Sequence, residues 1–267
     1  MRNSFMKYSP LVASIVLSLC LLRPAVALGQ DSYGSNVARE TTSDNHITIG
    51  IGGAALPEFQ GSKDYYIQPI PVIDIKQGRF FLRLGDGIGV NVIDTPNFQA
   101  GVSITPLRGY DADKVPAGIG KLGTSVGGRG FVSGTLGGVV GTLAVTAPFS
   151  GDAKGMFVEG EVSYPLQVTD RLLVVPGLRA TWADKKYLRS YFGVNAEQAA
   201  ASGLPEYRPS GGFQDVGATL AIKYRLTDHI SFVGSALMTR NLDRVMNSPF
   251  TERRWQPAGI LGVAYTF

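Results

Sequence analysis

Apolar residues alternate with small or polar ones through most of the chain after residue 46. In the segment 46–52, isoleucine takes every second position, and histidine, threonine or glycine fills the others. A period of two is the pattern of a β-strand with two unlike faces. No stretch after residue 30 is apolar over the ~20 residues that a membrane-spanning helix needs. The sequence therefore predicts an all-β fold. The alternation recurs in the segments 98–105, 156–164, 215–225 and 259–267.

The polar face of these strands indicates where the fold resides. Its charged residues are few and are diluted by Gly, Ser and Thr, and only 17% of the whole chain is charged. A barrel surface facing water would be richer in Lys and Glu. Tyr164, Trp182, Tyr224 and Tyr265 fall near strand ends, where the aromatic girdle of a membrane barrel lies. We expect a transmembrane antiparallel up-and-down β-barrel in the bacterial cell outer membrane, with a soluble periplasmic barrel as the alternative.

Short and long connections alternate along the chain. Short turns face the periplasm in such barrels and long loops face outside, which places both chain ends in the periplasm and predicts about 12 strands, with ten as second choice. Gly85-Asp86-Gly87 is short where a long loop is expected. The alanine-containing segment 184–202 predicts one short helix in an extracellular loop. The long loops are expected at 57–63, 108–122, 149–154, 184–211 and 241–255.

The amino terminus has the form of a secretory signal peptide. Two basic residues precede an apolar run from Leu11 to Leu22, and Ala25-Val26-Ala27 fits the small-x-small cleavage rule. We expect a signal peptide at residues 1–27, cleaved after residue 27 or, alternatively, after residue 29. Residues 28–45 are polar and without periodicity, so we expect a flexible periplasmic segment there. The barrel would then occupy residues 46–267.

Residues that carry enzyme chemistry are scarce. The two histidines, His46 and His229, are both expected at periplasmic strand starts, as interface or turn residues. Ser–His lipid hydrolases of this membrane act at the outer leaflet, so these histidines lie on the wrong side. The one cysteine, Cys20, lies in the signal, and no His pair or calcium loop is present. Gly127 to Gly130 resembles a phosphate loop but lacks the Lys-Ser/Thr that follows one, which favours a flexible strand. We expect no enzyme activity, no metal and no cofactor. With a net charge of +4 and no Lys/Arg block, we expect no nucleic-acid binding.

Seven charged residues are expected to face the lumen, because an Arg or Lys beside lipid at mid-depth costs ~2–4 kcal/mol. Such a set either lines a polar pore or forms a network that fills a narrow, closed barrel. The near balance of opposite charges favours the network. The seven are Arg83, Glu159, Glu161, Arg179, Asp215, Lys223 and Arg225.

Basic residues in the expected outer loops would meet the phosphates of lipopolysaccharide, and Arg can do so through two parallel hydrogen bonds. A solvated loop surface is the alternative. The predicted contacts are Lys185, Lys186, Arg189, Arg253 and Arg254. At the carboxyl terminus, Tyr265 and the last residue, Phe267, have the form of the signal that the barrel-assembly machinery reads.

The segment from Ala180 to Val194 carries the most specific resemblance to a known family. Ser202 to Tyr207, Gly211 to Phe213 and Tyr224 to His229 continue it, and Gly50 to Gly61 fits the family's opening. The chain resembles the MipA/OmpV family of outer-membrane proteins, the MltA-interacting protein family, over most of its length after the signal. The motif residues are Trp182, Ala183, Asp184, Tyr187, Tyr191, Phe192 and Gly193.

The resemblance implies an outer-membrane barrel with no catalytic residues. The family's name implies a scaffold that tethers a lytic transglycosylase to a peptidoglycan synthase. The expected function is therefore non-enzymatic and structural or scaffolding, linked to peptidoglycan remodelling. A small porin-like channel for ions or small solutes is the first alternative, and a surface adhesin is the second. The expected partners are outer-membrane lipid, lipopolysaccharide, the barrel-assembly machinery and periplasmic peptidoglycan enzymes, and the protein would be a monomer or a dimer.

Overall fold

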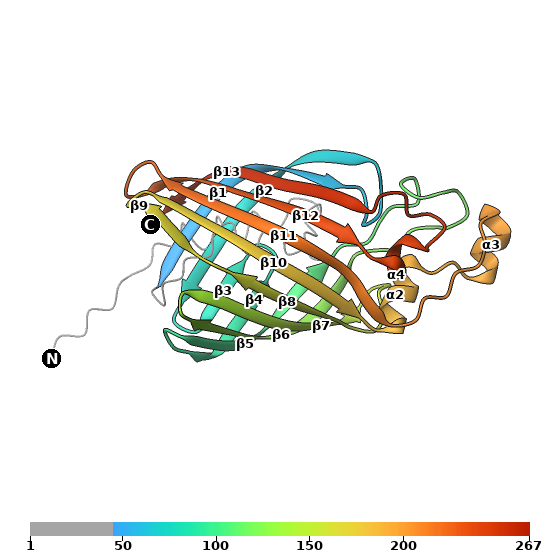
Figure 1. Cartoon of the computed structure of the whole chain (residues 1–267), viewed down its shortest axis with the longest axis horizontal. Coiled ribbons are helices and arrows are strands. Elements are labelled where there is room, and N and C mark those ends of the chain that lie inside the picture. Colours follow the sequence, from blue (N-terminus) through green and yellow to red (C-terminus); the bar gives the residue numbers. More distant parts are fainter. Residues whose placement is uncertain (1–44) are drawn as a thin grey trace, which may run out of the picture.

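A computed structural model of the protein describes residues 45–267. The expected signal peptide at residues 1–27, and residues 28–44 of the expected periplasmic segment, lie outside the described residues. The described chain forms one antiparallel sheet that closes on itself as a barrel, because the last strand pairs with the first and sets Thr48 opposite Thr266. Figure 1 shows the strands running obliquely along this barrel, with the helices at one end and the carboxyl terminus at the other.

Thirteen strands of the described chain occupy twelve places in the ring. Strand β9 lies on the same edge of β10 as β8, and the two pair with Leu172–Val174 and Gly177–Ala183 respectively. Pro165 separates them and interrupts the ladder because proline has no N–H to donate. The twelve-strand prediction is confirmed over the ten-strand one. The strands are β1 (His46–Pro57), β2 (Tyr65–Gln77), β3 (Phe80–Arg83), β4 (Gly87–Asp94), β5 (Phe98–Leu107), β6 (Ser125–Leu136), β7 (Val139–Ser150), β8 (Phe157–Ser163), β9 (Leu166–Thr169), β10 (Leu172–Ala183), β11 (Gly212–Arg225), β12 (Ile230–Asn241) and β13 (Trp255–Thr266).

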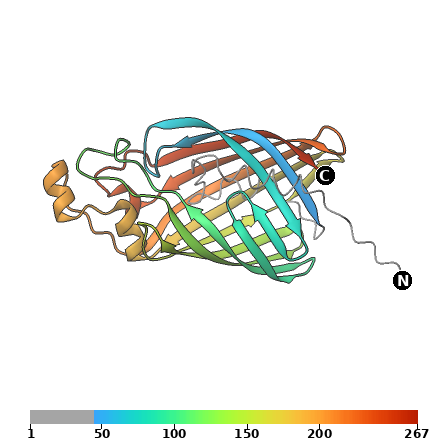
Figure 2. The same ribbon diagram turned by 180° about the vertical axis from the view of Figure 1, so that it is seen from behind.

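Short and long connections lie at opposite ends of the barrel, as the sequence predicts, with the short turn 84–86 between β3 and β4 as the exception. We call these the turn end, which holds the short turns and the carboxyl terminus, and the loop end, which holds the long loops. The reverse view in Figure 2 shows the blue-to-green strands of the first half of the chain and the same helices at the loop end. The turns are residues 78–79, 95–97, 137–138, 170–171 and 226–229, and the loops are residues 58–64, 108–124, 151–156, 184–211 and 242–254.

The barrel wall has a gap beside β2 on the side of the loop end. The gap arises because β3 has only four residues and pairs only with Asp74–Gln77 of β2. The rest of β2 faces no described strand on that side. The carbonyl of Ile73 accepts a hydrogen bond from Leu84 N (3.1 Å), so the odd-numbered residues of β2 direct their backbone groups towards this gap. Pro69 and Pro71 occupy the next odd positions, and proline leaves no unpaired N–H there. The two prolines therefore reduce the number of unpaired backbone donors at this open edge.

The upper end of this gap is bridged by side chains. The guanidinium of Arg108 lies 4.8 Å from the ring centroid of Tyr66 on β2 and donates to the carbonyl of Glu58. Lys114 Nζ lies 3.2 Å from Glu58 Oε1, and this hydrogen bond raises the pKa of Lys114. The loop after β5 is thus fastened across the gap to the loop after β1.

The outer wall is apolar over the height of a lipid bilayer. Ile51, Ile67 and Leu261 are 68%, 83% and 75% exposed. The ten residue steps from Trp255 to Tyr265 extend ~33 Å along the strand, or about 25 Å along the barrel axis at a tilt of ~40°, which matches the apolar band of membrane barrels. Exposed aromatic residues border this band. They are Tyr65, Phe149, Phe213 and Trp255 at the loop end, and Phe80, Phe98, Tyr164, Tyr224, Phe232, Tyr265 and Phe267 at the turn end.

The loops hold three helices, α2 (Lys185–Phe192), α3 (Ala196–Ser202) and α4 (Asp243–Met246). The short helix predicted over 184–202 is present, but the segment contains two helices rather than one. Asp184 caps α2 by accepting from Tyr187 N, and Asn195 starts a new helix through a capping box with Gln198. The extended backbone at Gly193 separates the two helices. Within residues 45–267, no helix is long and apolar enough to cross a membrane.

Candidate functional site

A band of alternating charges crosses the inside of the barrel. Arg129 donates to Glu159, and its Nε lies 3.7 Å from Asp86 Oδ1. Arg179 Nη2 lies 3.7 Å from Glu159 Oε1 and 3.8 Å from Asp215 Oδ1. These five side chains are between 1% and 13% exposed. The order Asp86, Arg129, Glu159, Arg179, Asp215 gives each arginine an acid on both sides, so the charges compensate one another locally.

Glu159, Arg179 and Asp215 belong to the predicted lumen set, whereas Arg129 and Asp86 were not predicted. The interpretation of Gly127 to Gly130 as a merely flexible strand overlooked the arginine. Odd-numbered residues of β6, such as Ser125, Gly127 and Arg129, are the buried ones. The alternation in the sequence was therefore sufficient to place Arg129 on the inner face.

A loop reaches into the barrel and joins this band. Gln60 Nε2 donates to Asp215 Oδ2 (3.0 Å) and Asn241 Oδ1 (2.9 Å), and Gln60 Oε1 accepts from Gln214 (2.7 Å). Gln60 is only 4% exposed. The amide of Gln256 completes the attachment by accepting from Gly61 N (2.9 Å). We call the loop 58–64 the latch, since interior side chains of three strands, β11, β12 and β13, hold it inside the barrel mouth.

The latch requires glycine at position 61. Its φ is +98°, a conformation that side chains with a Cβ rarely adopt. An added Cβ would also lie 2.7 Å from Thr251 Cγ2. The carbonyl of Gly61 accepts from the backbone N–H groups of Glu252 and Arg253, which ties the first loop to the last.

A second charged cluster lies nearer the turn end. Asp74 Oδ2 lies 3.2 Å from His46 Nε2, and its Oδ1 accepts from Arg83 Nε (3.1 Å). Lys76 Nζ lies 2.7 Å from Asp94 Oδ2, with the lysine side chain only 1% exposed. Arg83 is in the predicted set. The expectation that His46 is an interface or turn residue was wrong, because even-numbered residues at the start of β1 face inwards and His46 is buried against Asp74.

The remaining residues of the predicted lumen set lie towards the turn end. Glu161 and Lys223 are half-buried, on β8 and β11. Arg225 is exposed at the last position of β11 and donates to the carbonyl of Asp170 in the neighbouring turn. His229 is exposed in the turn, where its Nδ1 lies 2.9 Å from Thr266 O and its ring stacks on Tyr265.

The inner face of the opposite wall is apolar. Inward side chains of β1, β2, β12 and β13 pack into an apolar cluster. Apolar side chains on both faces are the pattern of a filled interior. The cluster comprises Ala54, Leu56, Ile70, Val72, Val233, Leu237, Ala258, Ile260 and Ala264.

The loop end is covered by a packed apolar core, which we call the cap. Helix α2 buries one face, and its Tyr187 and Tyr191 contact Phe157 (4.8 Å between ring centroids) and Tyr110 (5.4 Å). Tyr110 also donates to the carbonyl of Tyr191 (3.2 Å), and burial raises the pKa of Tyr110 above its ordinary value. The cap comprises Phe59, Leu107, Tyr110, Val115, Ile119, Leu122, Phe157, Ala183, Tyr187, Leu188, Tyr191, Phe192, Val194, Val245 and Phe250.

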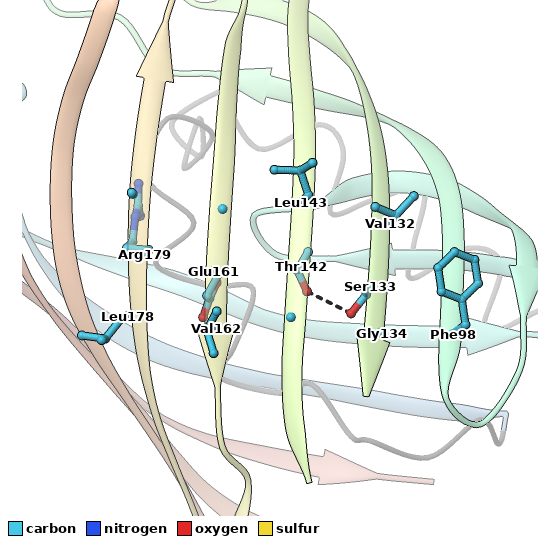
Figure 3. Close-up of a pocket in the computed structure, with 13 residues that line it drawn as sticks. Phe98, Val132, Ser133, Gly134, Thr142, Leu143, Glu161, Val162, Leu178 and Arg179 are labelled. Carbon is cyan, nitrogen blue, oxygen red and sulfur yellow. Dashed lines mark hydrogen bonds between the residues drawn. The ribbon is translucent and has the colours of Figure 1, made fainter. Parts of the chain in front are cut away.

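The hollow drawn in Figure 3 has a volume of about 560 Å³. It is lined by residues of the barrel strands and not by residues of the loops. Val132, Leu143 and Leu178, which line it, take outward positions and are 44%, 51% and 67% exposed. Ser133 and Thr142 take the alternate positions, and their hydroxyls lie 2.9 Å apart. The alternation of exposure along these strands assigns the apolar lining of this hollow to the outer surface.

Comparison with known proteins bears on this arrangement. The family model described as "MltA-interacting protein MipA" matches residues 49–267, which is nearly the whole described chain. The chain belongs to the MipA family. The resemblance predicted from Trp182 to Val194 is thereby confirmed.

Named relatives of the family agree with an outer-membrane location. The chain is 30% identical over 96 residues to "MltA-interacting protein" of Escherichia coli (strain K12), a match covering 36% of this chain and 38% of that protein. The match thus spans less than half of that relative's length. This chain is also 23% identical over 266 residues to "24 kDa outer membrane protein" of Pasteurella multocida (strain Pm70), and the match covers 95% of this chain and 98% of that protein. The protein is a MipA-family barrel of the bacterial outer membrane.

Solved structures of outer-membrane barrels are similar in outline. The NanC porin superposes with a TM-score of 0.46 at 10% identity, covering 82% of this chain and 98% of that one. The outer-membrane protein OmpT of Vibrio cholerae superposes with a TM-score of 0.37 at 7% identity, covering 86% and 100%. Likeness at this level carries no information about function.

The residues of the family motif are structural parts of the cap. Tyr187, Tyr191 and Phe192 supply the buried face of α2, and Asp184 caps its first turn. Asp184 also constrains Gly155, where a Cβ would lie 2.1 Å from its carboxylate. Ala183 is fully buried, whereas Trp182 is half-buried and alternates with it at the end of β10. The most specific sequence signal in this MipA-family chain thus encodes the closure of the loop end.

The five basic residues predicted to contact lipopolysaccharide are all exposed at the loop end. Arg189 donates to the carbonyl of Pro209 (3.1 Å), and Arg254 donates to Asp243 (3.2 Å). Their contact with lipopolysaccharide stays a prediction. Within the described chain, no group of three or more His, Cys, Asp or Glu residues is arranged to hold a metal.

Proposed function

We propose that the protein is a non-enzymatic, non-conducting structural barrel that acts as a scaffold for peptidoglycan-remodelling enzymes at the outer membrane. The observation that carries the non-conducting part is the closure of the loop end. A cap of aromatic and aliphatic side chains covers it, and the latch inserts Gln60 below the cap. A water-filled porin needs a continuous polar passage, and buried apolar residues interrupt one.

The interior below the cap supports the same proposal. Arg129 and Arg179 are 9% and 5% exposed, each in contact with acids from other strands. Salt-bridged arginines that span neighbouring strands stiffen a barrel and occupy its cross-section. The apolar inner wall of β12, β13, β1 and β2 fills the other side.

The partner class follows from the name of one relative, an Escherichia coli protein called MltA-interacting. We propose that the turn end of this chain, which faces the periplasm when long loops face outside, presents the docking surface. Arg79 and Arg171 are exposed in two of its turns. Acidic groups on a periplasmic enzyme would complement them, with a modest effect on affinity and a larger one on association rate.

Binding of the host's lytic transglycosylase to the full chain in lipid nanodiscs, measured by biolayer interferometry, tests the scaffold. We expect saturable binding that weakens when Arg79→Glu and Arg171→Glu are combined. Arg208→Glu, a reversal of an exposed charge in the loop 184–211, is the matched control and should change nothing. Absence of binding by the folded chain, or equal loss in both variants, would contradict the scaffold proposal.

A porin-like channel is the second candidate, and the charged band is the observation that favours it. If the latch and cap moved together, Arg179 and Glu159 would line the opening. The adhesin reading has less support, since the aromatic residues of the loops are mostly buried in the cap rather than presented outside.

A further inference from the structure

Two arginines on the outer wall at the loop end lack acidic partners within the described chain. Arg240 lies on the outer face of β12 opposite Trp255, and its guanidinium is 5.7 Å from the centre of that ring. Arg253 precedes Trp255 by two residues and lies close to the outward-facing Tyr65. Both arginines are exposed. Arg254, by contrast, pairs with Asp243 at 3.2 Å. Two uncompensated positive charges therefore lie within the aromatic border of the apolar band.

An apolar groove lies below these arginines on the same strands. It has a volume of about 670 Å³, and its lining is almost entirely apolar. Gly53, Ala55, Ala236 and Gly259 form its floor, and larger side chains such as Ile67 flank it. The register sets Ala236 beside Gly259 and Gly259 beside Ala55, so one row of small residues crosses three strands. This row begins four residues from Arg240, or ~13 Å along the strand.

Charge and groove together have the dimensions of one lipid. Guanidinium groups bind phosphate oxygens in pairs, and Trp favours the membrane interface. An acyl chain that starts at the headgroup level reaches ~15 Å to the bilayer centre, which takes it into the groove. Small residues let a chain approach the backbone closely, where dispersion contacts add up.

We propose that this wall binds lipid A, the diphosphorylated acyl glycolipid of the outer leaflet. Arg240 and Arg253 hold its phosphates, Trp255 packs beside the headgroup, and an acyl chain lies over Gly53, Ala236 and Gly259. Two separate guanidinium groups suit two phosphate monoesters better than the single phosphodiester of a glycerophospholipid. This site is on the outer surface and does not depend on whether the lumen conducts.

Trp255 supplies the readout, because the chain has only one other tryptophan, Trp182. The full-length Trp182→Phe protein, refolded in detergent, is titrated with diphosphorylated lipid A while Trp255 fluorescence is followed. The same protein is then titrated with dephosphorylated lipid A and with phosphatidylglycerol. This comparison of lipids uses no further protein variant. We expect saturable binding of lipid A that is at least tenfold tighter than that of either comparison lipid. Equal affinity for the three lipids would overturn the proposal.

Two variant pairs separate the headgroup from the groove. Arg240→Gln combined with Arg253→Gln should weaken lipid A binding at least tenfold, and Arg208→Gln should not weaken it. Gly53→Leu fills the groove, and Gly130→Leu is its control on β6, because an added Cβ meets nothing within 4 Å at either position. Gly53→Leu should weaken binding severalfold and Gly130→Leu should leave it unchanged. Unaltered affinity in the double arginine variant, with folding verified by heat-modifiable gel migration, would overturn the assignment of the phosphates. Equal effects of the two leucines would overturn the assignment of the groove.

Discussion

Glu159 is the central acid of the charged band, and its removal gives the sharpest test of what that band does. Glu159 contacts both Arg129 and Arg179, and its side chain is 11% exposed. Glu159→Gln keeps the shape of the side chain and removes one negative charge. The band then holds two arginines and two acids instead of three, and both arginines lose their nearer acid.

The magnitude follows from the burial of these groups. Removing one partner from a buried ion pair costs about 3–5 kcal/mol, because the remaining charge stays desolvated. Arg129 keeps Asp86 at 3.7 Å and Arg179 keeps Asp215 at 3.8 Å. We therefore expect the lower end, about 3 kcal/mol of the free energy of unfolding. With a denaturant dependence of ~2 kcal/mol per molar urea, the midpoint should fall by about 1.5 M.

The assay is urea unfolding of the barrel refolded in lipid vesicles, followed by tryptophan fluorescence. Glu206→Gln is the matched control, since Glu206 pairs with Arg208 at 3.3 Å while both side chains are about half exposed or more. An exposed pair contributes below about 1 kcal/mol. If Glu159→Gln lowered the unfolding free energy no more than Glu206→Gln, the band would not stabilise the barrel and our reasoning on its burial would be refuted.

Three further predictions concern the latch, the gap beside β2 and the cap. Gly61→Ala should release the latch, since its Cβ meets Thr251, and limited proteolysis should then cut near residue 61; an uncut loop would contradict the latch. Pro71→Ala adds an N–H at the open edge of β2 and should lower the unfolding free energy by about 1–3 kcal/mol in a urea titration, whereas a rise would mean that the edge is paired. Tyr110→Phe should cost about 1 kcal/mol through the lost hydrogen bond to Tyr191. Because burial raises the folded-state pKa of Tyr110, its contribution is complete below the ordinary tyrosine pKa of about 10 and is lost as the pH rises through the folded-state value, so Tyr110→Phe should remove that part of the alkaline destabilisation.

The strand pattern was predictable because the two faces of each strand lie in different surroundings. Lipid outside and side chains inside impose a period of two, and this fixed the twelve-strand ring and the inward direction of Glu159 and Arg179. The same parity places Arg129 and His46 inside, although the glycine-rich context of the first and the terminal position of the second obscured it. The alternation of inward and outward positions therefore identifies interior residues that were not recognised from their residue type.

Other features depend on contacts that alternation does not encode. The latch needs Gln60 to meet Asp215 and Asn241, which lie 155 and 181 residues away. The short hairpin of β3 and β4 becomes visible only once Pro69 and Pro71 are seen to face an empty edge. The apolar inner wall of β1, β2, β12 and β13 was missed because its strands carry apolar residues on both faces, so alternation alone does not show that the inner face is apolar.

The cap combines a local sequence motif with contacts to residues far away in the sequence. The motif from Trp182 to Gly193 was recognisable in the sequence, and the alanine-containing segment 184–202 predicted a short helix in this loop. Its partners come from three other loops and from the start of β8, with Phe59, Tyr110, Phe250 and Phe157 among them. The helical pattern of this segment could not predict that one face of α2 closes a barrel.

Planar-bilayer conductance of the purified, refolded protein tests the central claim of a closed barrel most directly. Folding is verified beforehand by heat-modifiable gel migration. The account predicts no current steps from the folded protein. Reproducible steps from the unmodified protein, altered by Arg179→Ala, would contradict the closed barrel and establish a channel lined by the charged band.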